Sequence, residues 1–100
     1  MLPETLAKIK KRLPQVIGVK EATGNLTQIS DIVEYCGPDF AVLSGDDFTV
    51  LPTLAVGGVG AISVVSNIVP GMMAAMCDAF FAGDLAKAKD LHYRMAPLCR

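Results

Sequence analysis

Short apolar runs alternate with longer mixed stretches along this chain. The apolar runs cover residues 15–21, 40–45 and 59–65, and each is nearly continuous in hydrophobic residues. Runs of this kind are typical of parallel strands buried on both faces, whereas a strand with one wet face alternates apolar and polar residues. The pattern therefore predicts three strands of a parallel sheet.

The stretches around these runs carry helix signals. Asn25 has the side chain of a helix cap, and Gln28 follows it at the spacing of a capping box. Pro52 is expected either to sit in the first turn of its helix or to impose a kink, and Pro97 is expected to follow the end of the last helix. The helices are predicted over residues 3–13, 25–36, 48–56, 70–83 and 84–96.

The alternation of strands and helices is typical of consecutive β/α units. Three parallel strands alone leave two open sheet edges. The chain is 52% hydrophobic with a mean hydropathy of +0.45, which is more apolar material than so small a globule can bury. A complete β/α barrel takes about 250 residues. We therefore expect residues 1–100 to form a single partial domain, a slice of a larger β/α fold.

Charge and cysteine content exclude several classes of partner. A net charge of −1 gives no electrostatic case for nucleic acid or an anionic membrane, and no apolar run is long enough for a transmembrane helix. Cys36, Cys77 and Cys99 lack metal-ligand spacing, and His92 is the single histidine, so no metal site is expected. Free cysteines on helices and no recognisable signal peptide indicate the cytoplasm.

Lys20 is the first candidate for chemistry, because ligands of parallel α/β folds gather at the carboxyl ends of strands. Strand alternation places Lys20 on the same face as Val16 and Gly18. A lysine that points into a confined, poorly solvated space is a nucleophile that forms Schiff bases with carbonyl compounds. Two ordinary alternatives stay open, a side chain that snorkels to solvent and one that pairs with a carboxylate such as Asp46.

Other polar and glycine-rich positions favour structural interpretations. Asp46 and Asp47 could orient a substrate, but capping of the following helix is the favoured interpretation. The pair at 57–58 follows a helix and precedes a strand, so it predicts a helix stop rather than a phosphate loop. Methionines at 72, 73 and 76 predict packing, and His92 is expected at the surface or at an interface.

Three motifs together resemble one family. GVKEATGNL at 18–26, LSGDD at 43–47 and GGVGAISVVSN at 57–67 follow the order and spacing of dihydrodipicolinate synthase, a pyruvate-dependent class I aldolase family of lysine biosynthesis. The resemblance runs along the whole chain. It implies the C-terminal portion, about strands 6–8 and the following helices, of an α/β (β/α)8 TIM barrel.

The resemblance also implies a reaction and its residues. Lys20 would form an imine with pyruvate, and the resulting enamine would attack aspartate semialdehyde, a lyase-class step of the diaminopimelate route. Gly45 and Ile62 match family positions beside the substrate, and the covalent imine makes a separate cofactor unnecessary. The family's carboxylate-binding loop and proton relay have no counterpart within residues 1–100, so little turnover is expected from the isolated chain.

Two other functions remain open. The chain resembles the related pyruvate lyase N-acetylneuraminate lyase less closely, because its GVKEATG segment follows the synthase pattern. A non-catalytic β/α fragment that self-associates or complements a missing part is the second alternative. Exposed sheet edges and surplus apolar surface predict a homo-oligomer in either case.

Overall fold

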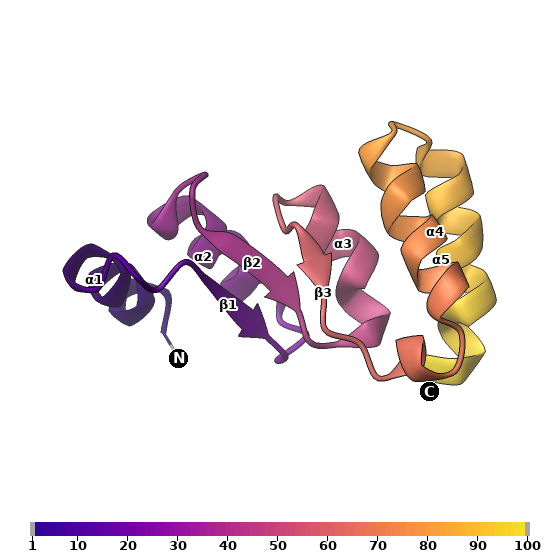
Figure 1. The fold of residues 1–100 in the computed structure, drawn as a ribbon, viewed down its shortest axis with the longest axis horizontal. Coiled ribbons are helices and arrows are strands. Elements are labelled where there is room, and N and C mark those ends of the chain that lie inside the picture. Colours follow the sequence, from indigo (N-terminus) through magenta and orange to yellow (C-terminus); the bar gives the residue numbers. More distant parts are fainter. Residues whose placement is uncertain (1, 100) are drawn as a thin grey trace.

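The computed structural model describes residues 2–99, in which three parallel strands form one sheet in the order β1-β2-β3 (Figure 1). The strands are β1 (Gly18–Glu21), β2 (Ala41–Ser44) and β3 (Gly60–Ala61). The helices are α1 (Pro3–Arg12), α2 (Leu26–Cys36), α3 (Val50–Ala55), α4 (Pro70–Phe81) and α5 (Leu85–Cys99), with short 3-10 helices η1 (Asp47–Thr49) and η2 (Val65–Asn67). The predicted series of parallel β/α units is confirmed.

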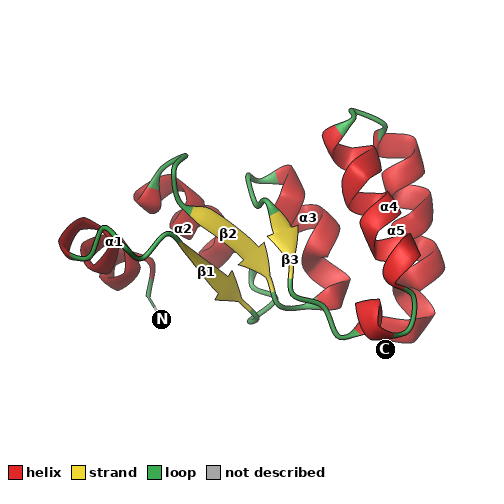
Figure 2. Cartoon of the chain, in the orientation of Figure 1, coloured by secondary structure: helices red, strands yellow, loops and turns green. Residues whose placement is uncertain are grey.

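The sheet has one face covered by helices and one face that the described residues leave open. Figure 2 shows α2 and α3 behind the strands, with no element of residues 2–99 in front of them. The register pairs Lys20 with Leu43 and Glu21 with Ser44, and paired residues of a parallel sheet share a face. Glu21 and Ser44 are buried and lie on the helix-covered face. Lys20 lies on the opposite side, which we call the open face.

The cap of α2 shows how local sequence sets up the end of β1. The Asn25 side chain accepts a hydrogen bond from the Gln28 backbone N–H at 3.1 Å, as the predicted cap requires. The Gln28 side-chain amide donates to the Glu21 carboxylate at 3.2 Å. The helix start therefore also supplies a partner for the buried carboxylate that follows Lys20.

All three predicted strands are longer than the strands that form, and β2 is shorter than predicted by one residue at each end. β1 begins at Gly18 rather than at residue 15, because Val16 packs against the helix-side core instead of lying on the open face. β3 contains Gly60 and Ala61, whereas residues 59–65 were expected. The chain leaves the sheet after Ala61 because Val65 turns into η2 and buries its side chain between the C-terminal helices.

The two prolines behave differently from each other. Pro52 is the third residue of α3, so it lies in the first turn, where its missing N–H has no helical partner to lose. Pro97 was expected to follow the end of α5, but the helix continues to Cys99. Pro97 removes one hydrogen bond near the helix end, while Met95 and Ala96 stay buried and keep this last turn packed.

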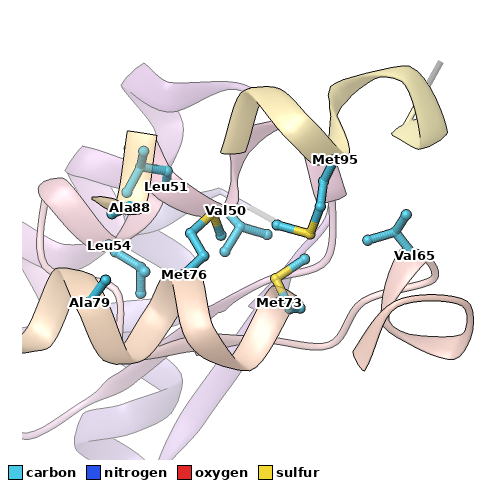
Figure 3. Packing of buried hydrophobic residues seen from close by; sticks show 9 residues of the cluster. All are labelled: Val50, Leu51, Leu54, Val65, Met73, Met76, Ala79, Ala88 and Met95. Atoms are coloured by element: carbon cyan, nitrogen blue, oxygen red, sulfur yellow. The ribbon is translucent and has the colours of Figure 1, made fainter. Parts of the chain in front are cut away.

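Two clusters of buried side chains hold the fold together. Figure 3 shows the larger one between α3, α4 and α5, formed by Val50, Leu51, Leu54, Val65, Met73, Met76, Ala79, Ala88 and Met95. The smaller one joins α1 and α2 to the sheet through Leu6, Ile29, Ile32, Cys36, Phe40 and Val42. Methionines 73 and 76 therefore pack as predicted, with Met72 at the edge of the cluster.

The cysteines also behave as small apolar residues. Cys36, Cys77 and Cys99 are free and lie on α2, α4 and α5. Burial raises the pKa of each thiol, which keeps it protonated near neutral pH. Within residues 2–99, no helix has both the length and the apolarity that a membrane span requires.

Candidate active site at the carboxyl ends of the strands

Lys20 lies at the position that strand alternation predicted. It is the third residue of β1 on the open face, and its neighbour Glu21 points to the helices and is 6% exposed. The Lys20 side chain is exposed, so residues 2–99 do not form the expected confined space around it. Nor does a salt bridge join Lys20 to Asp46 or to another carboxylate of the described chain. Of the two ordinary alternatives, the structure favours a solvated lysine over a paired one.

Gly45 lies directly against the side chain of Lys20. A Cβ atom added at Gly45 would lie 2.5 Å from Lys20 Cε and 2.9 Å from the Cβ of Ala22, closer than side-chain carbons approach. The Gly45 N–H also donates to the Glu21 carbonyl at 2.8 Å, which extends the pairing of the two strands. The absence of a side chain at Gly45 is therefore what lets the lysine pass over the end of β2.

Ile62 follows the neighbouring strand at the same edge of the sheet. Its N–H donates to the Ser44 carbonyl at 2.8 Å, and its side chain is 51% exposed. Because Ala61 pairs with Ser44 on the helix-covered side, alternation places Ile62 on the open face with Lys20. The three predicted site residues thus lie at the carboxyl ends of three adjacent strands and share one face.

The acidic pair behaves differently from the favoured capping interpretation. Asp46 accepts a hydrogen bond from the Thr49 hydroxyl at 2.9 Å. The Asp47 carboxylate reaches the loop after β3, where it accepts from the Ser63 hydroxyl and, at 3.0 Å, from the N–H of Val65. Asp47 therefore caps η2, 18 residues away, rather than the helix that follows it. Sequence reasoning placed Ser63 at the end of its strand but missed its contact with Asp47, because nothing in the local pattern joins the two residues.

The C-terminal helix packs against this group of loops. The His92 ring meets the Phe48 ring edge to face at 5.6 Å, so His92 is half-buried rather than a free surface residue. Burial lowers the pKa of His92. Burial first, and then the charges of Asp47 and Asp46, raise the pKa of Cys99. The contact between Phe48 and His92 places α5 beside the residues that follow β2.

Other surface features do not add to this site. No three histidine, cysteine, aspartate or glutamate side chains of residues 2–99 are grouped so that they could hold a metal ion. A groove of about 390 Å³ lies between α1 and α2 and includes none of the residues discussed above except Cys36. Its lining is Ala7, Lys8, Lys10, Lys11, Tyr35 and Cys36.

The Dihydrodipicolinate synthetase family matches the chain over residues 1–100. The chain belongs to this family. It is 65% identical to the 4-hydroxy-tetrahydrodipicolinate synthase of Nitratidesulfovibrio vulgaris (strain DSM 19637 / Miyazaki F) over 100 residues, which are 100% of the chain and 34% of that relative.

Solved structures of dihydrodipicolinate synthase family proteins have the same fold. The 4-hydroxy-tetrahydrodipicolinate synthase of Methylacidiphilum fumariolicum SolV superimposes with a TM-score of 0.95 at 36% identity, over 98% of this chain and 33% of that chain. The family protein YagE of E. coli K12, solved in complex with pyruvate, gives a TM-score of 0.92 at 27% identity over 97% and 34% of the two chains.

These similarities confirm the predicted family and fold class. The chain is a mixed α/β segment, with a parallel sheet, of a TIM-barrel family. It spans about a third of the length of the relatives that it matches. In a β/α barrel the helices form an outer ring around the strands, so the open face corresponds to the interior side of such a barrel.

Proposed function

We propose that the chain supplies the Schiff-base lysine of a dihydrodipicolinate synthase. The observation that carries the proposal is the placement of Lys20 at the carboxyl end of β1, on the open face, with Gly45 against its aliphatic chain. Catalytic residues of β/α barrels occupy the carboxyl ends of strands. Ile62 on the same face would line the space beside the bound substrate.

The proposed reaction uses pyruvate and aspartate semialdehyde. The neutral amine of Lys20 attacks the keto carbon of pyruvate, and loss of water leaves an imine. Loss of a proton from the pyruvate methyl group gives an enamine, whose carbon forms a new bond to the aldehyde carbon of the second substrate. The amino group of that substrate then replaces Lys20 at the imine carbon, which closes the product ring and releases the lysine. The imine nitrogen is the electron sink, so the chemistry requires no separate cofactor. Such a role belongs in the cytoplasm, where free cysteines persist.

Residues 2–99 do not enclose Lys20 as a nucleophilic lysine requires. Its side chain is exposed, whereas a nucleophilic lysine is kept neutral by desolvation or by a neighbouring charge. We therefore propose that further β/α units cover the open face in the working enzyme and that the 100 residues alone turn over little substrate. A homo-oligomer is part of this proposal, because apolar side chains such as Ile17 and Val64, each 73% exposed, need covering.

A chimera tests the function in a complete barrel. Residues 1–100 would replace the matching 34% of the Nitratidesulfovibrio vulgaris relative. We expect the chimera to condense pyruvate with aspartate semialdehyde, and Lys20→Arg to lower the rate at least about a thousandfold, because the guanidinium cannot form the imine. Lys87→Arg is the matched control, since Lys87 lies near the start of α5, at the end of the helix pair opposite to η2, and should leave the rate within about twofold.

Borohydride reduction in the presence of pyruvate identifies the nucleophile directly. The adduct should map to the peptide that contains Lys20 and should be missing from Lys20→Arg. An adduct on Lys8 or Lys87 would overturn the assignment, as would an inactive chimera beside an active parent enzyme. Cleavage of N-acetylneuraminate in place of the condensation would favour the related lyase.

A further inference from the structure

The loop after β3 carries Ile62 and is held to the end of β2 by few contacts. At its start, the Ile62 N–H donates to the Ser44 carbonyl at 2.8 Å. At its end, the Val65 N–H donates to the Asp47 carboxylate at 3.0 Å. Between these points the loop has 73% of the Val64 side chain exposed, so packing contributes little to its position. The hydrogen bonds therefore determine where Ile62 lies.

Asp47 supplies two of the links to this loop. One carboxylate oxygen accepts from the Ser63 hydroxyl and the other from the N–H of Val65. Hydrogen bonds to an ionised acceptor are stronger than those between neutral groups. Ser63 in turn accepts from the Ser66 N–H at 3.0 Å, which continues the network into η2. A single carboxylate thus joins the loops that follow β2 and β3.

Both ends of this connection are anchored in the fold. On the β3 side, Val65 is 2% exposed and packs in the cluster between the C-terminal helices. On the β2 side, Phe48 follows Asp47 directly and contacts the ring of His92 on α5. The Asp47 carboxylate therefore holds the loop after β3 against well-packed parts of the fold. Asp47 lies two residues after Gly45 in the sequence and contacts Ser63, the residue next to Ile62.

We propose that Asp47 is a positioning residue, whose carboxylate holds the loop after β3 against the loop after β2 and thereby fixes Ile62 relative to Gly45 and Lys20. This inference rests on the proposed function of Lys20. Asp47 acts through Ser63 and Val65 and does not contact the reacting atoms. A carboxylate near the strand ends has a second possible effect, a direct electrostatic influence on Lys20. The two effects predict different results for an asparagine at position 47.

The test uses the chimera and compares Asp47→Ala with Asp47→Asn. Alanine removes both acceptors, and we expect kcat/KM for pyruvate to fall about tenfold, because small misplacements of groups in an active site reduce rates strongly. Asparagine keeps an oxygen for the Val65 N–H and places an amide N–H toward the Ser63 oxygen. It should therefore restore most of the lost kcat/KM, although it carries no charge.

Asp84→Ala is the matched control. Asp84 also accepts a hydrogen bond from a backbone N–H, that of Lys87 at 3.1 Å, but it lies in the connection between α4 and α5. Figure 1 shows this connection at the end of the helix pair opposite to η2. Asp84→Ala should leave kcat/KM within about twofold, so a general loss of stability is separated from a loss of position.

A variant of Ser63 tests the contact between Asp47 and Ser63 from the side of the loop after β3. Ser63→Ala should lower kcat/KM about threefold, and the double variant with Asp47→Ala should be little worse than Asp47→Ala alone, because Asp47→Ala has already lost the hydrogen bond from Ser63. Hydrogen exchange at the Val65 amide should accelerate in Asp47→Ala and stay unchanged in Asp84→Ala. If Asp47→Ala does not fold, Ser63→Ala and Asp47→Asn carry the test.

Each part of the proposal would be overturned by a different experimental result. An unmutated chimera that is inactive would overturn the proposed function, and the role of Asp47 with it. An active chimera in which Asp47→Ala matches Asp84→Ala would overturn the positioning role alone. Asp47→Asn as impaired as Asp47→Ala would show that the charge acts directly, and an unchanged Ser63→Ala would show that the loop link is unimportant.

Discussion

The two faces of the three-stranded sheet differ in almost every physical respect. On the helix-covered face, Val42 is 1% exposed and Ser44 is fully buried. On the open face, the Lys20 side chain is exposed and Ile62 is 51% exposed. Burial of apolar surface is the dominant favourable contribution to folding. The first face therefore stabilises this chain, while the second carries the proposed chemistry and contributes little to stability.

Polar groups follow the same division. On the covered face, the Ser44 hydroxyl donates to the Asp46 carbonyl at 2.9 Å, and the Glu21 carboxylate accepts from Gln28. Buried polar groups without such partners are costly. On the open face, Lys20 has no salt-bridge partner within residues 2–99. The chain thus supplies hydrogen-bond partners for these two polar side chains of the covered face, while the surroundings of its proposed nucleophile must come from outside these residues.

The largest expected effect is a difference in stability between substitutions behind the sheet and substitutions on its open face. Ile29 is fully buried in the cluster behind the sheet, so Ile29→Ala should lower the free energy of unfolding by about 2 to 4 kcal/mol. Ile62→Ala removes a similar side chain from the open face and should cost less than about 0.5 kcal/mol. Urea unfolding of the 100-residue chain measures both. Equal losses would mean that the open face is buried in solution, for example in an oligomer.

Two glycines on the open face refine the comparison. A Cβ at Gly18 would lie 2.6 Å from the Ala41 carbonyl oxygen, a backbone atom that cannot move without shifting β2. Gly18→Ala should therefore cost about 1 to 3 kcal/mol of stability. A Cβ at Gly45 would meet the flexible Lys20 side chain first. Gly45→Ala should cost less stability but should reduce the pyruvate adduct on Lys20 in the chimera at least about tenfold.

Unfolding curves and adduct yields for this pair are measured on the same proteins. We expect Gly18→Ala to lose more stability than Gly45→Ala, and Gly45→Ala to lose more of the pyruvate adduct than Gly18→Ala. If Gly45→Ala left the adduct yield unchanged, close packing of Gly45 against Lys20 would have no bearing on the reaction.

The features that sequence predicted correctly are those that depend on near neighbours. The Asn25 cap, the methionine packing and the face of Lys20 all follow from spacings of a few residues. The exposure of Lys20 was not predictable from its strand, because it depends on which elements lie in front of the sheet. The prediction of a confined site described a complete barrel, and residues 2–99 provide one wall of it.

Longer-range contacts explain the remaining differences. Asp47 and Ser63 are 16 residues apart, and their contact arises only after two strands have paired in register. Pro97 stays helical because its neighbours are buried against α4, a tertiary effect that outweighs a local helix-breaking tendency.

A smaller effect is expected from a buried hydroxyl behind the sheet. Thr53 is fully buried, and its hydroxyl has no hydrogen-bond partner among the described residues. Thr53→Val replaces the hydroxyl with a methyl group of similar shape and should raise the free energy of unfolding by about 1 kcal/mol. Thr53→Ser is the matched control, because it keeps the hydroxyl and loses a methyl group, and it should be destabilising. A loss of stability in Thr53→Val would show that the hydroxyl has a partner in solution.

The smallest effect concerns pH and the packing of α5 against the loops. Burial lowers the pKa of His92 in the folded state, so the unfolded state binds a proton more readily. The contribution of His92 to stability is thus fully present above its ordinary pKa of about 6.5 and is lost as pH falls below it. His92→Phe keeps an aromatic ring for the contact with Phe48 but does not titrate. Wild type should therefore lose stability relative to His92→Phe as pH falls, whereas Tyr93→Phe, altered at an exposed neighbour, should follow wild type. A constant difference between wild type and His92→Phe at all pH values would show that His92 is solvated and that α5 does not close over the loop after β2.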